Sequence, residues 1–241
     1  MPKILCSSNK NIDIEEILQF AKERDPYIFE WFPDLKDVSS EKLSEAVKEA
    51  VDLAYEKYAV EIDAKINFLN SQKELFEKIM NIMSEICETN WDGIENIDIF
   101  LGVNPIAPRN LQRKYFAVPV YESEESLLKF CSHELLHFIY FKKFHEIFGD
   151  KYETYEYPHS NWVLSEILAP VILSDGELQK LVLADVNLYP HWAEFNERYK
   201  LIEIFSTYYN EGESFQSFLA EAKRIYEKMD AEFELTKKMT S

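Results

Sequence analysis

Glycine, cysteine and histidine are all scarce in this sequence. The 241 residues include 5 glycines, 3 cysteines and 5 histidines. Because glycine supplies the backbone freedom that tight turns need, its scarcity favours a helix-dominated protein. The cysteines, Cys6, Cys87 and Cys131, are odd in number and include no C-x-x-C pair. The sequence therefore predicts neither a disulfide framework nor a cysteine zinc site.

Long apolar runs and basic residues are also lacking. No stretch reaches the roughly 18 apolar residues that a membrane-spanning helix needs, and residues 1–8 lack the apolar region of a signal peptide. Acidic residues outnumber basic ones by 44 to 26, which gives a net charge of -18. This charge argues against nucleic acid and against an anionic membrane surface as partners. We expect a cytoplasmic protein.

The clearest chemical signal is the segment His133-Glu134-Leu135-Leu136-His137. Two helical residues four apart lie about 6 Å apart along the axis and about 40° apart around it, so both imidazoles can reach one metal ion. Zinc held by imidazole nitrogens, with a position open for water, is the site that such a pair would build. Glu134 is then placed to take the proton of that water. The competing interpretation is that both histidines pack in or beside the core without a metal.

The residues around this motif predict a helix over residues 124–148. Ser123 is a suitable N-cap, Glu124 and Glu125 are favoured in the first turn, and Gly149 is a C-terminal stop. Apolar side chains surround so much of this helix that its middle must be buried. They are Leu127, Leu128, Phe130, Leu135, Leu136, Phe138, Ile139 and Phe141. A glutamate and two histidines are costly to bury there unless something compensates them, and a dication does so directly.

A catalytic zinc site needs a third protein ligand. His145 lies about 12 Å beyond His137 along the same helix, so it cannot reach the same ion. Glu166 is the better candidate, because it lies in the apolar segment 161–169, which Ser160 could cap as a helix. Pro170 predicts that this helix kinks or ends near Glu166. The alternative for Glu166 is a carboxylate on the helix surface.

Two segments upstream of the motif are expected to be strands. Residues 96–103 and 115–121 are rich in β-branched and aromatic residues and are bounded by turn residues. Pro119 favours the edge of a sheet for the second strand. An edge strand that leads into the motif helix could bind an extended peptide as an added strand, or it could be an ordinary edge.

Helical patterns dominate the N-terminal third. They predict one helix around residues 14–21, a second after Ser40, and a third that begins with the capping box Ser71-x-x-Glu74. The side chains expected to be buried in the third helix are Leu75, Ile79, Ile82 and Ile86. Residues 60–68 fit either a strand or a helix.

The motif at residues 133–137, followed by Trp162-Val163-Leu164-Ser165-Glu166-Ile167-Leu168-Ala169, resembles the gluzincin branch of the zincin metallopeptidases. The metzincin pattern does not fit, because its glycine and its final histidine are absent. The resemblance covers roughly residues 97–170. It implies that His133, His137 and Glu166 bind one zinc ion and that Glu134 is the general base in hydrolysis of a peptide or protein substrate. Thermolysin-like members carry an aspartate where this chain has Pro170.

Hydrolysis by a metal-activated water also needs a donor to the oxyanion that forms. Tyr155, Tyr157 and His159 precede the predicted Glu166 helix, and Tyr189 and His191 follow it. The sequence does not choose among these five residues. Substrate and oligomeric state are not indicated either.

Beyond Gly176 the pattern predicts further helices to about residue 230, with Pro190 in a first turn, a break at Gly212 and a fraying tail after Glu234. We expect an α+β fold, helix-dominated with a small mixed sheet beside the motif helix, as in zincins. No linker marks a boundary, so residues 1–241 should form one globular unit. Within it, a helical subdomain of residues 1–90 would pack on a metal-bearing part of residues 91–241.

Three hypotheses of function follow from the sequence. The first is a zinc metallopeptidase of gluzincin type, and the second is a zinc-bearing protein of this fold that binds or regulates without catalysis. The third is a helical protein without metal, in which the motif is accidental.

Overall fold

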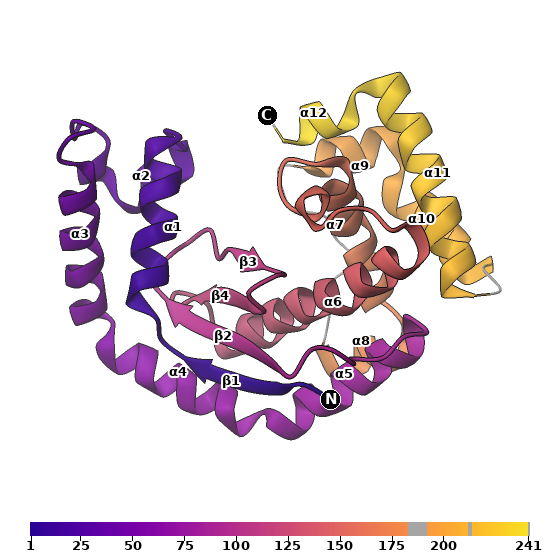
Figure 1. Cartoon of the computed structure of the whole chain (residues 1–241), viewed down its shortest axis with the longest axis horizontal. Helices are drawn as coiled ribbons and strands as arrows, with labels where there is room; N and C mark the ends of the chain where they lie inside the picture. Colours follow the sequence, from indigo (N-terminus) through magenta and orange to yellow (C-terminus); the bar gives the residue numbers. More distant parts are fainter. Residues whose placement is uncertain (183–191, 212–213, 241) are drawn as a thin grey trace. The chain divides into compact units, whose positions relative to one another are not determined.

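The structure is a computed structural model that describes residues 1–182, 192–211 and 214–240. Tyr189, Pro190, His191 and Gly212, on which sequence predictions were made, lie outside the described residues. The chain forms two compact units (Figure 1). The sheet unit comprises residues 2–74 and 94–131, and the helical unit comprises Met1, residues 75–93 and residues 132–241. This division differs from the boundary expected near residue 90.

The sheet unit contains a four-stranded mixed sheet in the order β1-β2-β4-β3. The strands are β1 (Lys3–Ser7), β2 (Asn96–Gly102), β3 (Arg109–Asn110) and β4 (Tyr115–Pro119). Strands β1 and β4 run parallel to β2, and β3 runs antiparallel to β4. Since helices make up most of the described chain, the predicted helix-dominated α+β class with a small mixed sheet is confirmed.

Strand β4 corrects one prediction, because it does not lie at the sheet edge. It pairs with β2 on one side and with the short β3 on the other. Pro119 is tolerated since it is the last residue of the strand, where the ladder ends and a missing N–H costs little. The backbone N–H of Val120 then donates to the carbonyl of Gly102 and continues the pairing by one step.

Helices of the sheet unit lie along this sheet and against one another. They are α1 (Lys10–Lys22), α2 (Pro26–Trp31), the 3-10 helix η1 (Pro33–Leu35), α3 (Leu43–Lys57) and α4 (Ala59–Ser71). Helix α1 packs on α3, and α4 runs alongside β1 and β2 (Figure 1). Residues 60–68, whose sequence pattern fitted either a strand or a helix, are helical. Helix α4 buries Ile62 and Leu69, which lie two turns apart.

The helical unit holds most of the remaining elements. They are α5 (Lys73–Ile86, whose first two residues belong to the sheet unit), α6 (Glu124–Phe148, in this unit from Ser132), η2 (Tyr152–Tyr155), α7 (Ser160–Leu173), α8 (Gly176–Val182), α9 (Ala193–Tyr199), α10 (Leu201–Glu211), α11 (Phe215–Phe233) and α12 (Leu235–Met239). Helix α7 contacts η2, α8, α10 and α12, and every residue from Val163 to Leu173 is buried. It is the core helix of this unit.

Three local predictions made from the sequence are corrected, one of them in part. Helix α7 does not end near Glu166, which was one of the two outcomes predicted from Pro170, but continues past the proline to Leu173. The segment after Glu234 forms α12 rather than fraying. Ser71 belongs to α4 and its hydroxyl donates to the carbonyl of Phe68, so it does not cap α5.

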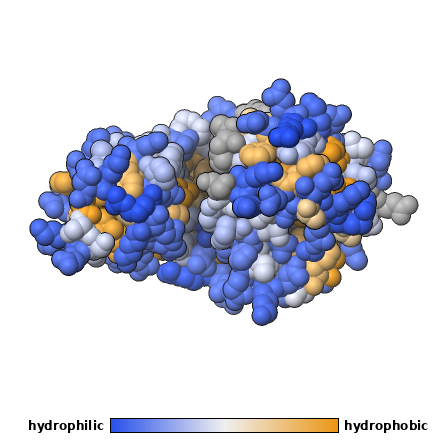
Figure 2. Space-filling view, turned by 90° about the horizontal axis from the view of Figure 1, so that it is seen from above, coloured by the Kyte–Doolittle hydropathy of each residue, from blue (hydrophilic) through white to orange (hydrophobic). Residues whose placement is uncertain are grey.

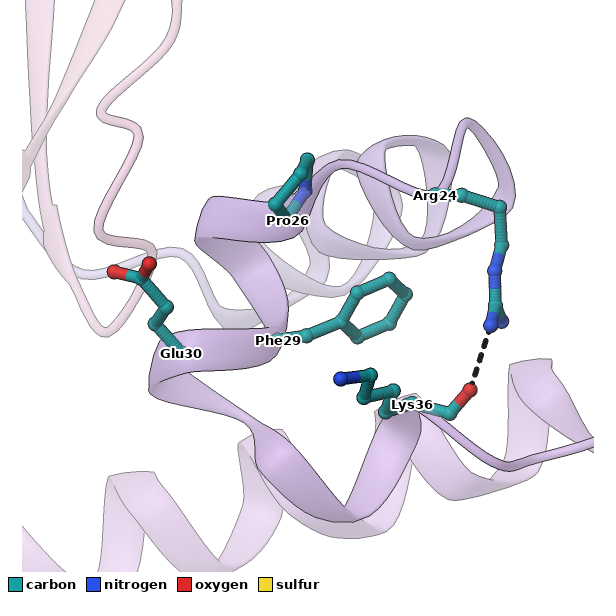
Figure 3. Close-up of a pocket in the computed structure, with 5 residues that line it drawn as sticks. All are labelled: Arg24, Pro26, Phe29, Glu30 and Lys36. Atoms are coloured by element: carbon teal, nitrogen blue, oxygen red, sulfur yellow. Dashed lines mark hydrogen bonds between the residues drawn. The ribbon is translucent and has the colours of Figure 1, made fainter.

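The surface is mainly hydrophilic in the view of Figure 2, with hydrophobic patches between the hydrophilic residues. Within the described ranges, no helix is both long and apolar enough to cross a membrane. A surface pocket of about 430 Å³ lies in the sheet unit, beside α2. In it the Arg24 guanidinium lies over the Phe29 ring and donates to the carbonyl of Lys36 at 2.8 Å (Figure 3).

Candidate metal centre

Helix α6 presents both motif histidines from a largely apolar environment. Its observed bounds, Glu124–Phe148, are those predicted. The Ser123 hydroxyl accepts from the backbone N–H of Ser126 at 3.1 Å, and Gly149 has the positive φ of a C-terminal stop. Ser132 and residues 134–141 are buried, whereas His133 is partly exposed. The predicted burial of the helix middle is therefore confirmed.

Helix α7 brings Glu166 to the two histidines. His133 Nε2 lies 2.9 Å from Glu166 Oε2, and His137 Nε2 lies 3.2 Å from Glu166 Oε1. The two histidine Nε2 atoms are 2.9 Å apart. The three side chains are one group of potential metal ligands, with ligand atoms all within 4.8 Å of one another. The structure thus brings together the three residues that the sequence singled out.

These separations fit a small, tetrahedrally coordinated ion. Ligands about 2.05 Å from zinc at tetrahedral angles are separated by about 3.3 Å. The observed 2.9–3.2 Å contacts are slightly shorter than this. At a separation of 2.9 Å, at most one proton can lie between the two facing nitrogens. The donor set of two imidazoles and a carboxylate also matches the preference of zinc.

The electrostatics of Glu166 favour its charged form. Burial raises the pKa of this carboxyl, but the His137 charge and the hydrogen bonds from both imidazoles lower it more, so that the pKa lies well below its ordinary value. A charged carboxylate is the form that can bind a cation. The His133 side chain keeps 23% exposure, against 1% for His137 and 2% for Glu166. His133 is therefore the most exposed side chain of the group.

Glu134 follows His133 on α6 and is 5% exposed. A general base must lie within hydrogen-bond reach of the water whose proton it accepts. The role of Glu134 as general base therefore stays a prediction from the sequence.

Two other residues considered from the sequence, His145 and Tyr155, both contact the carbonyl of Asp150. His145 bonds through Nδ1 to the carbonyl of Asp150 at 2.9 Å and takes no part in the ligand group, as predicted from its distance along the helix. Tyr155 is fully buried, stacks on Phe141 and donates to the same Asp150 carbonyl at 3.0 Å.

Two further oxyanion candidates lie just before α7. Tyr157 donates its hydroxyl to the carbonyl of Thr240, and His159 is an exposed residue at the N-cap of α7. Tyr189 and His191 lie outside the described residues. The choice of oxyanion donor therefore stays open between these residues.

A polar network that the sequence did not reveal holds the start of α7. Asn161, which is 8% exposed, donates through Nδ2 to Thr154 Oγ1 at 3.0 Å and to Asp150 Oδ2 at 3.2 Å. Its Oδ1 accepts from Lys223 Nζ at 3.2 Å, and this lysine also pairs with Asp150. These contacts fix the helix that carries Glu166, five residues further on. The sequence signal that could have indicated this network is the polar Asn161 directly before an apolar run.

Comparisons of the chain with models of known protein families, with curated proteins and with solved structures found no match. The case for a function therefore depends on the geometry of the ligand group.

Proposed function

We propose that this protein is a zinc-dependent peptidase of gluzincin type, with His133, His137 and Glu166 as zinc ligands and Glu134 as general base. The observation that carries the proposal is the convergence of two imidazole nitrogens and a carboxylate at separations of 2.9–3.2 Å. These atoms come from two different helices, and His133 and Glu166 are 33 positions apart in the sequence. The order of the residues along the chain adds support, since it resembles that of gluzincins.

In this proposal, metal binding and proton transfer are carried out by different residues of the chain. The two histidines and Glu166 hold the ion, and the apolar packing of α6 and α7 keeps these ligands in place. When bound, zinc lowers the pKa of a coordinated water and polarises a substrate carbonyl. Glu134 accepts the proton of the attacking water and passes it to the leaving amine. The exposed side of His133 gives the substrate access.

A hydrogen-bonded His-His-Glu group without metal would also satisfy these side chains, so metal analysis is the first test. Purified protein should contain one zinc per chain. His137→Ala and Glu166→Ala should lose it, whereas His145→Ala, a histidine on the same helix outside the group, should keep it. Full retention of zinc by Glu166→Ala would exclude this residue as a ligand.

Catalysis is tested separately from metal binding. Glu134→Gln should keep zinc but lose cleavage of a mixed peptide library, because an amide cannot accept the proton. Glu125→Gln, which changes an exposed carboxylate in the first turn of the same helix, should keep both properties. Zinc-loaded wild type that cleaves no peptide would favour a binding or regulatory role instead.

A further inference from the structure

An aromatic cluster lies one helical turn from Glu166. Trp162 precedes Glu166 by four residues on α7, which places the two side chains on one helix face with Cβ atoms about 6 Å apart. The Trp162 ring packs with Tyr157 at 5.3 Å between ring centroids and with Trp192 at 5.7 Å. Both pairs are edge-to-face, with interplanar angles of 82° and 80°. Aromatic surface therefore continues the helix face that carries the proposed zinc ligand.

Hydrogen bonds to the end of α12 fix this cluster. Trp192 donates its Nε1–H to the carbonyl of Met239 at 3.0 Å, and the Tyr157 hydroxyl donates to the carbonyl of Thr240. Helix α12 itself packs on α7. The polar atoms of two rings are thus bound to backbone, and the rings are held in place before any ligand arrives. Such preorganisation lowers the entropic cost of binding.

The cluster is exposed at one end and buried at the other. Trp192 is 1% exposed, Trp162 is half-buried, and Tyr157 keeps 58% of its surface exposed. The rings of Tyr157 and Trp162 are uncharged and flat, so their accessible faces suit an apolar or aromatic group rather than an ion. The buried indole supports a surface that solvent reaches at Tyr157.

We propose that Tyr157 and Trp162 form the subsite that receives an aromatic or bulky apolar side chain of the peptide substrate, next to the cleaved bond. The inference rests on the proposed function. Successive residues of an extended peptide are about 3.4 Å apart, and a phenylalanine side chain reaches several ångströms further. A residue adjacent to a bond held at the metal group can therefore reach rings that begin one helical turn away. Tyr157 and Trp162 are specificity-determining residues in this scheme.

The test compares peptides that differ only at the two residues flanking one cleavable bond, with phenylalanine, alanine or glutamate at each. Wild type should cleave the best phenylalanine peptide at least about tenfold more efficiently than its alanine counterpart, in kcat/KM. Tyr157→Ala should reduce this ratio several-fold while leaving the zinc content unchanged. Tyr152→Ala removes another exposed tyrosine, five residues earlier and outside the cluster, and should leave the ratio unchanged.

A second measurement does not depend on turnover. In zinc-loaded Glu134→Gln protein, calorimetry should show that the uncleaved phenylalanine peptide binds about tenfold more weakly once Tyr157→Ala is added. Trp162→Leu provides an independent variant if Tyr157→Ala unfolds, as judged by circular dichroism. Equal cleavage of the phenylalanine and alanine peptides, or a preference that survives both cluster variants, would overturn the subsite alone. Absence of all cleavage and peptide binding by zinc-loaded wild type would overturn the peptidase proposal together with the subsite.

Discussion

His137 Nε2 and Glu166 Oε1 lie 3.2 Å apart in a part of the protein where both side chains are almost fully buried. The pair links α6 to α7, and His133 contacts both of its members at 2.9 Å. Removing one partner of a buried charge pair typically costs several kcal/mol. A cation shared by these atoms would therefore join two helices of the helical unit as well as support chemistry.

Zinc removal should lower thermal stability. A ligand that binds only the folded chain and is present at about 1,000 times its dissociation constant raises the free energy of unfolding by about 4 kcal/mol. For a chain of this size that corresponds to a decrease in Tm of about 10 °C when a chelator removes the metal. Differential scanning fluorimetry with and without chelator, followed by zinc readdition, measures the effect. Glu166→Ala should show no such response, and an equal response in that variant would mean that zinc stabilises the protein elsewhere.

The ligand group was predictable from sequence because its signals are local. The spacing of His133 and His137 follows from helix geometry, and Glu166 is an acid within an apolar helical run. The network of Asn161, Asp150 and Lys223 was not predictable, since it joins residues up to 73 positions apart through side chains of ordinary surface type. Local patterns carry no information on such pairings.

The fold was predictable to different degrees along the chain. The bounds of α6 followed from the cap at Ser123, the apolar middle and the stop at Gly149. Strand β1 was missed, because it is five residues long and only Ile4 is buried. In helix α5 the predicted burial of Ile79 is confirmed, but Leu75, Ile82 and Ile86 are only partly buried. The other buried side chains are Phe76, Met80 and Met83. The helix has two apolar stripes, and tertiary packing decides which one faces the core.

Stability should fall with rising pH because of Asp13. Burial raises the pKa of this carboxyl from 3.8 to about 6, although the backbone N–H of Val103 and the Tyr55 hydroxyl donate to it at 2.7 and 3.0 Å. The folded chain thus binds more protons than the unfolded chain between these pH values. The stabilisation is complete below about pH 4 and is lost as pH rises through about 6, with a total of about 3 kcal/mol.

Asp13→Asn removes this titration. Relative to wild type, the free energy of unfolding of the variant should therefore rise by about 3 kcal/mol between pH 4 and pH 7. Urea unfolding of both proteins at each pH, with chelator present throughout, gives the difference directly. A difference that does not change with pH would show that the carboxyl titrates alike in the folded and unfolded chains.

Gly102 should not tolerate even a methyl group. A Cβ at this position would lie 2.2 Å from Asp13 Oδ2, which the hydrogen bonds from Val103 and Tyr55 hold in place. Gly102→Ala should therefore destabilise the protein by about 1–3 kcal/mol in urea unfolding. Gly176→Ala is the matched control, because a Cβ there meets no atom within 4 Å. If the clash is the cause, most of the penalty should disappear in an Asp13→Ala background; additive effects would point to another cause.

Asn161 should contribute to the stability of the helical unit through three hydrogen bonds at once. Asn161→Ala leaves Lys223 Nζ without one acceptor and Thr154 Oγ1 without its donor, in a site where Asn161 itself is 8% exposed. Loss of such buried bonds should reduce the free energy of unfolding by about 2 kcal/mol.

Glu227→Gln tests the outer end of the same network, where the pairing with Lys223 involves a side chain that is 60% exposed. That change should cost less than about 0.5 kcal/mol, because exposed ion pairs contribute little. Equal losses in the two variants, measured by urea unfolding, would show that charge rather than the buried amide holds the start of α7.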